Sequence, residues 1–245
     1  MIRRISILLA LLAITAYVIV AMTMLNGKPD REVCKGMDLT IKDSVNYGFV
    51  NYAEVKRILQ KDGLFPNGKK KETINIRALE ETLNKHPFIN QAECYFTSGD
   101  KIAVNVYQRV PVLHVISDEE DDFYIDHLGK IMDIPDRPVH VAVATGCINR
   151  KFARERLYPI GKYLQADRFW NSQVEQIYVN EKQELQLVPR VGNQILFFGS
   201  SDDYTEKFRK LRAFYQEALT KVGWNKYSRI NMEFGNQIIC TKKEK

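Results

Sequence analysis

The sequence is poor in cysteine, the residue that forms disulfides and many zinc sites. It has four cysteines, and no two of them form a Cys-x-x-Cys pair. This absence excludes zinc-finger spacing and the dense disulfide framework of a small secreted domain. We expect the four to be mostly small buried residues rather than disulfide partners: Cys34, Cys94, Cys147 and Cys240.

The usual motifs of catalysis are also absent. The chain has four histidines and contains no HExxH, GxSxG, GxxxxGKS/T or GxGxxG pattern. Asp126 and His127 could form an acid–base pair, with Ser117 or Cys147 as a nucleophile, but nothing in the sequence brings these residues together. A turn is the better interpretation of Asp126-His127. We therefore predict no enzymatic activity, no cofactor, no metal ion and no small-molecule substrate.

Neither sign of charge dominates the sequence. The 36 basic and 30 acidic residues leave a net charge of +6, and they are interspersed. Such a mild excess is typical of a solvated surface and does not indicate nucleic-acid binding. We interpret the two local charge runs, Lys69–Lys71 and Asp118–Asp122, as solvated loops. The alternatives are lipid headgroups beside the first run and a divalent cation on the second.

What the sequence does contain is a long apolar run near its start. No residue from Ile5 to Leu25 is charged, and a helix over this run would measure about 30 Å, the thickness of a bilayer's hydrocarbon core. We predict an uncleaved transmembrane helix over 5–25. A cleaved signal peptide is the first alternative, but Ala21-Met22-Thr23 is a poor cleavage site. A buried helix of a soluble protein is the second.

The residues around this run set its predicted orientation. Basic residues that flank a span stay on the cytoplasmic side, and Arg3 and Arg4 precede the run. Residues 1–4 would then be a cytoplasmic tail, and everything after the span would lie in a periplasm or an extracellular space. Residues 26–36 are polar and form a predicted linker.

Residues 37–111 have the pattern of one small domain. Apolar residues recur with the period of a strand in some segments and with that of a helix in others. The expected order is strand, helix, helix, strand, strand, over Met37–Ile41, Tyr52–Lys61, Ile76–Lys85, Gln91–Phe96 and Lys101–Gln108. Such an order packs two helices on one face of a three-stranded sheet.

Residues 112–245 indicate a β-rich domain with flanking helices. The helices are expected over Phe152–Gln165 and Asp203–Leu219. Short strands are expected over Leu113–Ile116, Phe123–Ile125, Lys130–Met132, Val139–Ala144, Val174–Val179, Glu184–Pro189, Gln194–Phe198, Arg229–Phe234 and Gln237–Cys240. The predicted class of the whole chain is α+β, with an N-terminal transmembrane helix.

Several short motifs make this organisation similar to a known family. His86-Pro87-Phe88-Ile89 follows the second helix and Arg109-Val110-Pro111-Val112 follows the last strand of the first domain, which resembles a POTRA domain (β-α-α-β-β). The Asp126-x-x-Gly129 turn, and Arg229–Phe234 followed by Gln237, resemble the second domain of FtsQ/DivIB proteins. Together with the single anchor, they make the chain similar to these bitopic bacterial cell-division proteins.

This resemblance implies a non-enzymatic scaffold of the divisome. It implies a single-pass protein of the cell inner membrane, at the septum, with periplasmic C-terminal domains. Its partners would be the bitopic proteins FtsB (DivIC in Gram-positive relatives) and FtsL, and indirectly the septal peptidoglycan synthases FtsW and FtsI.

In the family, the last strands and the adjoining helix dock FtsB. By resemblance, Phe234 falls at an aromatic position used for this docking, and Gln237–Cys240 would be an edge strand. The implied partner-binding residues are Arg229, Asn231, Phe234, Gln237, Ile238 and Ile239.

Two other functions compete with the scaffold. A membrane-anchored envelope enzyme, such as a cell-wall hydrolase, would need a pocket of converging titratable groups. A POTRA-bearing transport or outer-membrane assembly factor would normally have several POTRA units or the repeated strands of a β-barrel. The sequence suggests neither.

Overall fold

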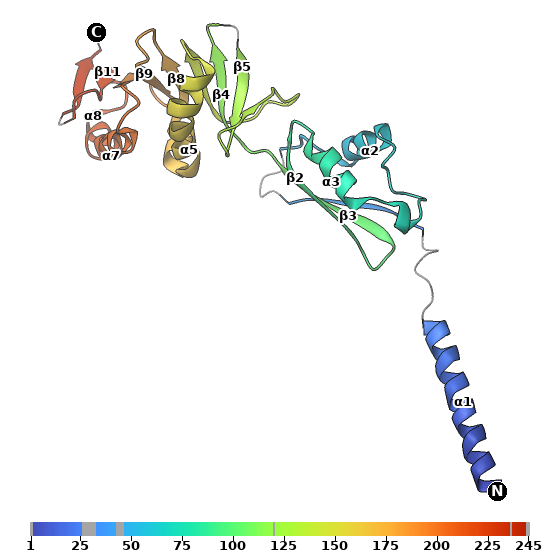
Figure 1. Ribbon diagram of the computed structural model, residues 1–245. Coiled ribbons are helices and arrows are strands. Elements are labelled where there is room, and N and C mark those ends of the chain that lie inside the picture. Colours follow the sequence, from blue (N-terminus) through green and yellow to red (C-terminus); the bar gives the residue numbers. More distant parts are fainter. Residues whose placement is uncertain (1, 26–32, 43–46, 120, 236, 244–245) are drawn as a thin grey trace. The chain divides into compact units, whose positions relative to one another are not determined.

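The computed structural model describes residues 2–25, 33–42, 47–119, 121–235 and 237–243. The chain forms two compact units (Figure 1). The first comprises Met1–Thr40, Ala53–Leu83 and Ala92–Asn105, and the second comprises Ile41–Tyr52, Asn84–Gln91 and Val106–Lys245.

The apolar run near the N-terminus forms a helix, α1, over Ile2–Leu25. Its side chains are described from Leu11 to Met22, so those of the predicted tail and of Ile5 to Ala10 lie outside the described part, as does most of the predicted linker. Among the described residues, no helix has the length and apolar character needed to cross a membrane. The structure thus does not confirm the predicted span.

A three-stranded sheet with the order β1-β3-β2 follows, built from β1 (Gly36–Ile41), β2 (Ile89–Phe96) and β3 (Lys101–Gln108). Helices α2 (Tyr52–Lys61) and α3 (Ile76–Asn84) lie on the same side of β2 and β3, and a short 3-10 turn (η2, Lys71–Thr73) precedes α3. Each helix buries two apolar residues: Val55 and Leu59 from α2, Leu79 and Leu83 from α3. The predicted order of elements is found here.

We had expected the lysine run 69–71 to be a simple solvated loop, but two of its side chains bond to other segments. Asp100, at the β2–β3 turn, accepts hydrogen bonds from Lys35 (2.7 Å) and Lys71 (2.6 Å). Lys69 Nζ donates to the carbonyl of Gly63. The hydrogen bonds from Lys35 and Lys71 hold the pKa of Asp100 well below its usual range. Two of the three lysines therefore tie segments of the first unit together.

The second unit is built on a nine-stranded mixed sheet with the order β12-β11-β10-β9-β8-β7-β4-β5-β6. Its strands are β4 (Pro111–Ser117), β5 (Asp122–Asp126), β6 (Ile131–Met132), β7 (Ala142–Gly146), β8 (Val174–Val179), β9 (Leu185–Pro189), β10 (Ile195–Gly199), β11 (Tyr227–Asn231) and β12 (Ile239–Lys242). The strands at its two ends are therefore β12 and β6. Together with the helices, this sheet confirms the mixed α+β class.

One layer of helices covers this sheet, and Figure 1 shows α5, α7 and α8 on the same side of the strands. The first helical segment consists of α4 (Arg150–Phe152), a π-helical segment (η3, Ala153–Leu157) and α5 (Tyr158–Ala166). Next comes α6 (Arg168–Gln173). The last segment consists of α7 (Tyr204–Phe214), a second π-helical segment (η4, Tyr215–Leu219) and α8 (Thr220–Val222).

The core lies between the helices and the sheet. It is centred on buried rings: Trp170 and Phe198 each lie 4.9 Å from Phe208, measured between ring centroids, and Tyr215 lies 5.8 Å from Trp170. Because strand residues alternate between faces, the other face of the sheet retains partly exposed apolar side chains. These are Ile116, Tyr178, Val188, Ile195 and Ile239.

Sequence periodicity missed one helix and misplaced the last two strands. Helix α6 is short, but Asp167 caps it by accepting hydrogen bonds from the N–H groups of Phe169 (2.9 Å) and Trp170 (3.3 Å). Strand β11 ends at Asn231 rather than Phe234, because the Asn231 side chain accepts from Glu233 N–H (2.8 Å) and turns the chain. Strand β12 begins two residues later than predicted.

The cysteines are all free thiols, and none forms a disulfide. Cys34 and Cys94 are buried, as predicted, and burial raises the pKa of Cys94 to about 12. Cys147 and Cys240 are only partly buried.

An ion pair joins α6 to α7. Arg212 donates to both carboxylate oxygens of Asp167 at 2.6 Å, and its guanidinium lies over the ring of Phe169. Burial raises the pKa of Asp167, but the hydrogen bonds from Arg212 and the backbone outweigh it, and the pKa lies below its usual value. A depressed folded-state pKa contributes stability above the unfolded-state pKa and loses it as pH falls.

We expect Asp167→Ala to lower the free energy of unfolding by about 1–2 kcal/mol at pH 7, through loss of the cap and the ion pair. Asp167→Asn keeps a capping oxygen and should cost less. Denaturant titration followed by tryptophan fluorescence isolates the second unit, which holds both tryptophans, Trp170 and Trp224. The Asn variant should approach wild type near pH 2. If the two proteins still differed in free energy of unfolding near pH 2, the ionised Asp167 carboxylate would not be the source of the difference.

Candidate partner-binding site

The end strand β12 presents one free edge. Among the described strands it pairs with β11 alone, in antiparallel register, with Ile230 opposite Cys240 and Asn231 opposite Ile239. Strand β11 in turn runs parallel to β10. An edge strand directs alternate N–H and C=O groups away from its sheet, where another strand can pair with them. The sheet of the second unit can therefore be extended at β12.

Phe234 lies in the connection between β11 and β12, after the strand rather than within it. The two preceding apolar residues, Ile230 and Met232, are buried in the core, whereas Phe234 is 45% exposed. Lys210 of α7 donates to the carbonyl of Gly235 and holds this connection against the helix. A large apolar ring is thus exposed in the connection that leads into β12.

A groove of about 360 Å³ runs between the last helical segment and the residues that lead into β12. Its apolar wall consists of Ala213, Phe214 and Ala218, and Gln237 and Ile238 form the other side. The charged side chains at its rim are Arg209, Lys210 and Glu217.

Two of these rim cations share one carboxylate. Glu206 accepts from Arg209 at 2.7 Å and lies 3.5 Å from Lys210. The hydrogen bond from Arg209 is the main reason that the pKa of Glu206 falls to about 2. The carboxylate therefore stays ionised at neutral pH and keeps both cations near the groove.

The six predicted binding residues fall into three groups around β12. Gln237 and Ile238 line the groove, and Phe234 lies at the turn. By their register, Arg229, Asn231 and Ile239 share the face of the sheet opposite the helices, where Ile239 is 44% exposed. The guanidinium of Arg229 covers the ring of Phe197 at 4.4 Å. These residues surround one edge without forming a single flat patch.

The structure adds residues that sequence reasoning missed. Lys210, Ala213 and Phe214 come from the helix next to the last strands, which the family resemblance includes in the docking surface, but none of its residues was nominated. Their role depends on which residues lie across the groove. A search for polar or small residues between the core positions of 203–219 could have suggested this face. Nothing in the sequence indicates that it meets Gln237 and Ile238.

The residues nominated for catalysis serve structural purposes in the second unit. Asp126 is fully buried; it accepts from Arg109 (2.7 Å) and from the N–H groups of Leu128 (3.0 Å) and Lys130 (2.8 Å). Its predicted turn is therefore present. Ser117 Oγ donates to the carbonyl of Ile148 (2.7 Å). The structure does not bring Ser117 together with His127.

Cys147 is a poor nucleophile in this setting. Burial, the nearby Asp118 and further acidic side chains raise the pKa of its thiol, so little thiolate forms at neutral pH. In the run 118–122, Asp118, Glu119 and Asp122 are exposed, as expected of a solvated loop, and Asp121 pairs with Arg150 at 2.7 Å; Glu120 lies outside the described residues. In the described part of the chain, no group of three or more potential ligands could hold a metal ion.

His114 and Asp122 form the one close histidine–carboxylate pair described here, and sequence reasoning did not find it. They lie on neighbouring strands, β4 and β5, with the imidazole stacked on the ring of Tyr124 at 4.2 Å. No nucleophile is recorded next to this pair among the described residues. We interpret it as cross-strand packing.

Comparison with known families agrees with this architecture. A family model for a POTRA-like domain matches residues 32–107. A second, described as FtsQ/DivIB, C-terminal related, matches residues 110–241 and so covers more than half of the chain, including the groove and all of β12 except Lys242. No curated protein matches the chain. The chain belongs to the FtsQ/DivIB, C-terminal related family.

Proposed function

We propose that this protein is a non-enzymatic scaffold of the bacterial division machinery that binds a small bitopic partner, of the FtsB or DivIC type, along β12. The family points to a role in cell division. The observation that carries the proposal is the free edge of β12, together with an exposed Phe234 in the connection before this strand and an apolar groove lined by Gln237 and Ile238, which lead into it.

Strand addition explains why these features occur together. The backbone of β12 would supply the hydrogen bonds of a new ladder, which give affinity with little dependence on sequence. Phe234 and the groove would supply the side-chain contacts that select the partner. Exposed aromatic rings next to a concave surface are typical anchors of protein interfaces.

The partner would also need a helix or an extended segment that reaches the groove. Phe214, Ala213 and Ala218 offer it an apolar wall, while Arg209 and Lys210 at the rim favour acidic residues on the incoming chain. A partner that adds a strand to β12 and lays an apolar, partly acidic segment beside α7 would use both surfaces at once. FtsL-type proteins would join through this partner, and FtsW and FtsI indirectly.

For location, we propose a single-pass anchor at Ile5–Leu25 in the cell inner membrane, with both folded domains in the periplasm at the septum. Support comes from the uncharged run, the basic Arg3 and Arg4 before it, and the helix α1 over Ile2–Leu25. Confinement to one membrane raises the effective concentration of membrane-bound partners, so moderate contacts suffice for assembly.

We predict that Phe234→Lys weakens binding to the extracytoplasmic part of the FtsB-type partner by about 30-fold or more, the effect of losing an interface anchor worth about 2 kcal/mol. Folding stability should change by no more than about 0.5 kcal/mol, because the ring is exposed. Binding of the full chain by biolayer interferometry, beside a denaturant titration, measures both quantities.

The matched control for this variant is Phe96→Lys. Phe96 has a similar exposure, 39%, but lies on β2 of the other sheet. It should leave the affinity unchanged. Equal losses in the two variants, or no loss in either, would remove Phe234 from the proposed interface.

We also predict that partner binding slows hydrogen exchange in β12 at least tenfold, at alternate amides of Ile239–Lys242, because these gain a strand partner. The opposite end strand, β6 (Ile131–Met132), is the internal control and should exchange as before. Hydrogen–deuterium exchange with peptide-level mass spectrometry resolves both segments. Protection at Phe234 and the groove without protection of β12 would favour side-chain docking over strand addition.

A further inference from the structure

A second concave site lies at the other end of the large sheet. It has a volume of about 520 Å³ and lies between the β5–β6 turn and the helical segment that begins at α4. Its lining residues are Leu128, Gly129, Ile131, Arg150, Lys151, Arg154, Glu155 and Tyr158. In the strand order, β5 and β6 are farthest from β12, so this site is separate from the proposed partner edge.

The wall formed by the β5–β6 turn is held in place by buried hydrogen bonds. Asp126 accepts from the N–H groups of Leu128 and Lys130 at 3.0 and 2.8 Å, and Arg109 binds the carbonyl of Ile131 at 2.8 Å. Gly129 has φ +75°, and a Cβ there would lie 3.1 Å from the ring of Tyr158. Glycine therefore permits the close approach of the two walls.

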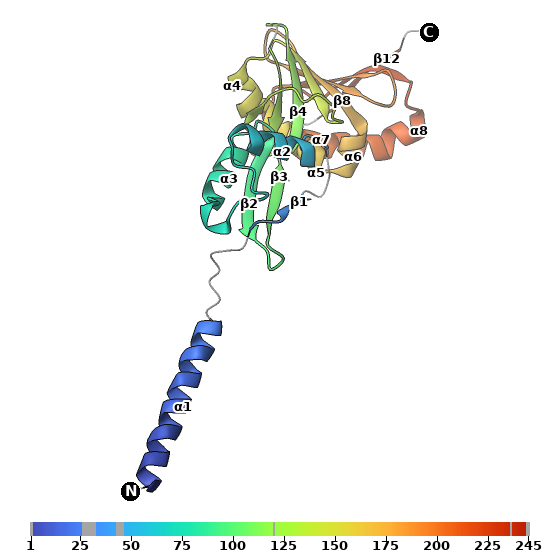
Figure 2. The same ribbon diagram turned by 90° about the vertical axis from the view of Figure 1, so that its right-hand side faces the viewer.

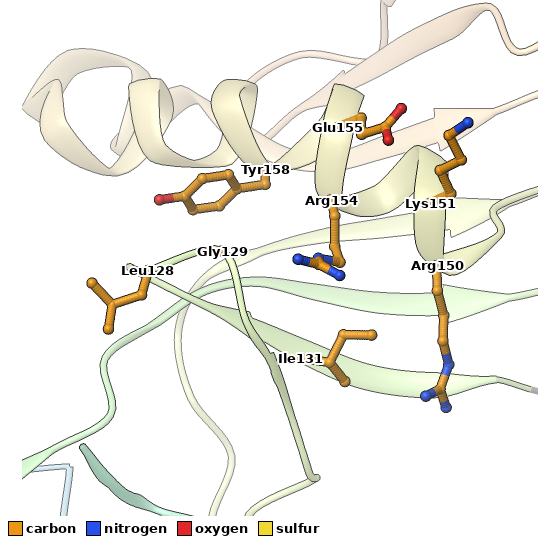
Figure 3. Close-up of a pocket in the computed structure, with 8 residues that line it drawn as sticks. All are labelled: Leu128, Gly129, Ile131, Arg150, Lys151, Arg154, Glu155 and Tyr158. Carbon is orange, nitrogen blue, oxygen red and sulfur yellow. The ribbon is translucent and has the colours of Figure 1, made fainter.

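The helical wall contains the π-helical segment Ala153–Leu157. A π-helical turn changes the direction of the side chains around it, and such turns occur often at functional sites. Its buried residues, Ala153 and Leu157, face the core, and Tyr158 donates to the carbonyl of His127 at 2.6 Å. Figure 3 shows Arg154 and Tyr158 directed toward the turn, whereas Lys151 and Glu155 point away from it.

Arg154 differs from its arginine neighbours in having no carboxylate. Arg150 binds Asp121 through two bonds, at 2.7 and 2.9 Å, and Arg156 binds Asp202 at 2.7 Å. No ion pair or hydrogen bond of the Arg154 side chain is recorded with any described residue. Its guanidinium projects into the pocket above Ile131 (Figure 3). A planar guanidinium matches a carboxylate through two parallel N–H···O bonds.

The surrounding charges favour one carboxylate over a multiply charged anion. Lys151 and Lys162 add positive charge near the pocket, the latter over the ring of Tyr158. Glu155 lies at the rim, and Asp121 and Asp133 both act on Arg150. These acidic groups oppose a phosphate dianion. The apolar surfaces of Leu128, Ile131 and Tyr158 match an uncharged side chain next to the ligand's carboxylate.

We propose that this pocket binds a short acidic segment of a protein partner, with a Glu or Asp carboxylate on Arg154 and an adjacent apolar side chain against Leu128 and Ile131. The proposal does not rest on strand addition at β12. Together, the two sites would let one sheet hold two different partners at its two ends.

The test measures binding of the full chain to two matched sets of peptides. In the first set each peptide carries a Glu or Asp flanked by two apolar residues, and the apolar residues are varied. In the second set the same peptides carry Gln or Asn in place of the acidic residue. We expect members of the acidic set to bind at least tenfold more tightly than their amide counterparts. Arg154→Gln should abolish that preference. Arg154→Lys keeps the positive charge but cannot make two parallel N–H···O bonds, so it should retain part of the preference.

Arg156→Gln is the matched control, since it removes an arginine of the same π-helical segment that binds Asp202 and does not line this pocket, and it should change the affinity less than twofold. Tryptophan fluorescence and FtsB-type partner binding should be the same in all variants, which separates a failure of this site from a failure at β12. Equal binding of the two peptide sets, an unchanged preference in Arg154→Gln, or stronger binding of inorganic phosphate than of the peptides would overturn the proposal.

Discussion

The constraint on which the second unit depends is that nine strands share one layer of helices. Each strand must turn its alternate apolar residues toward that layer, where Trp170, Phe208 and Tyr215 fill the space between sheet and helices. Slipping any strand by one residue would expose its core residues. Register is thus fixed across the sheet up to β11, whose Ile230 is fully buried.

The same constraint weakens at the end of the sheet. Strand β12 contributes only partly buried residues to the core, Cys240 within it and Ile238 just before it. Its place is determined by pairing with β11 more than by burial, and its outer edge has no described neighbour. Proteins commonly protect such edges with charge, and the strand ends in Lys242 followed by Lys243. A short edge next to lysines resists random association with other strands.

Much of this fold could be predicted from the sequence because its elements obey simple periodicities. Helix α2 and strands β3 and β8 have the predicted bounds, since each buries a regular apolar stripe. The predictions failed where a single polar side chain determines where a helix begins or a strand ends. Asp167 begins a six-residue helix, and Asn231 ends a strand three residues early. A periodicity analysis averages over such local hydrogen bonds and cannot register them.

The candidate sites were less predictable, for a different reason. Phe234 could be nominated because a family resemblance pointed to it, but alternation alone would have placed it in the core with Ile230 and Met232. Its exposure follows from the turn that Asn231 makes. The sequence indicated the Gly129 turn but not the Arg154 pocket, since the pocket requires this turn, the π-helical segment and an arginine without a carboxylate to coincide in space.

The two sites follow from one architectural fact. A sheet with a single helical layer has two ends, and at each end the chain must finish a strand without a neighbour beyond it. At β12 the solution is a free backbone edge with an apolar groove, and at β5–β6 it is a tight turn tied down by Asp126 and packed against Tyr158. The contacts proposed at the first end are main-chain hydrogen bonds, and those proposed at the second are made by side chains of a pocket. Partners at the two ends would therefore be recognised by different chemistry, and neither would compete with the other for its contacts.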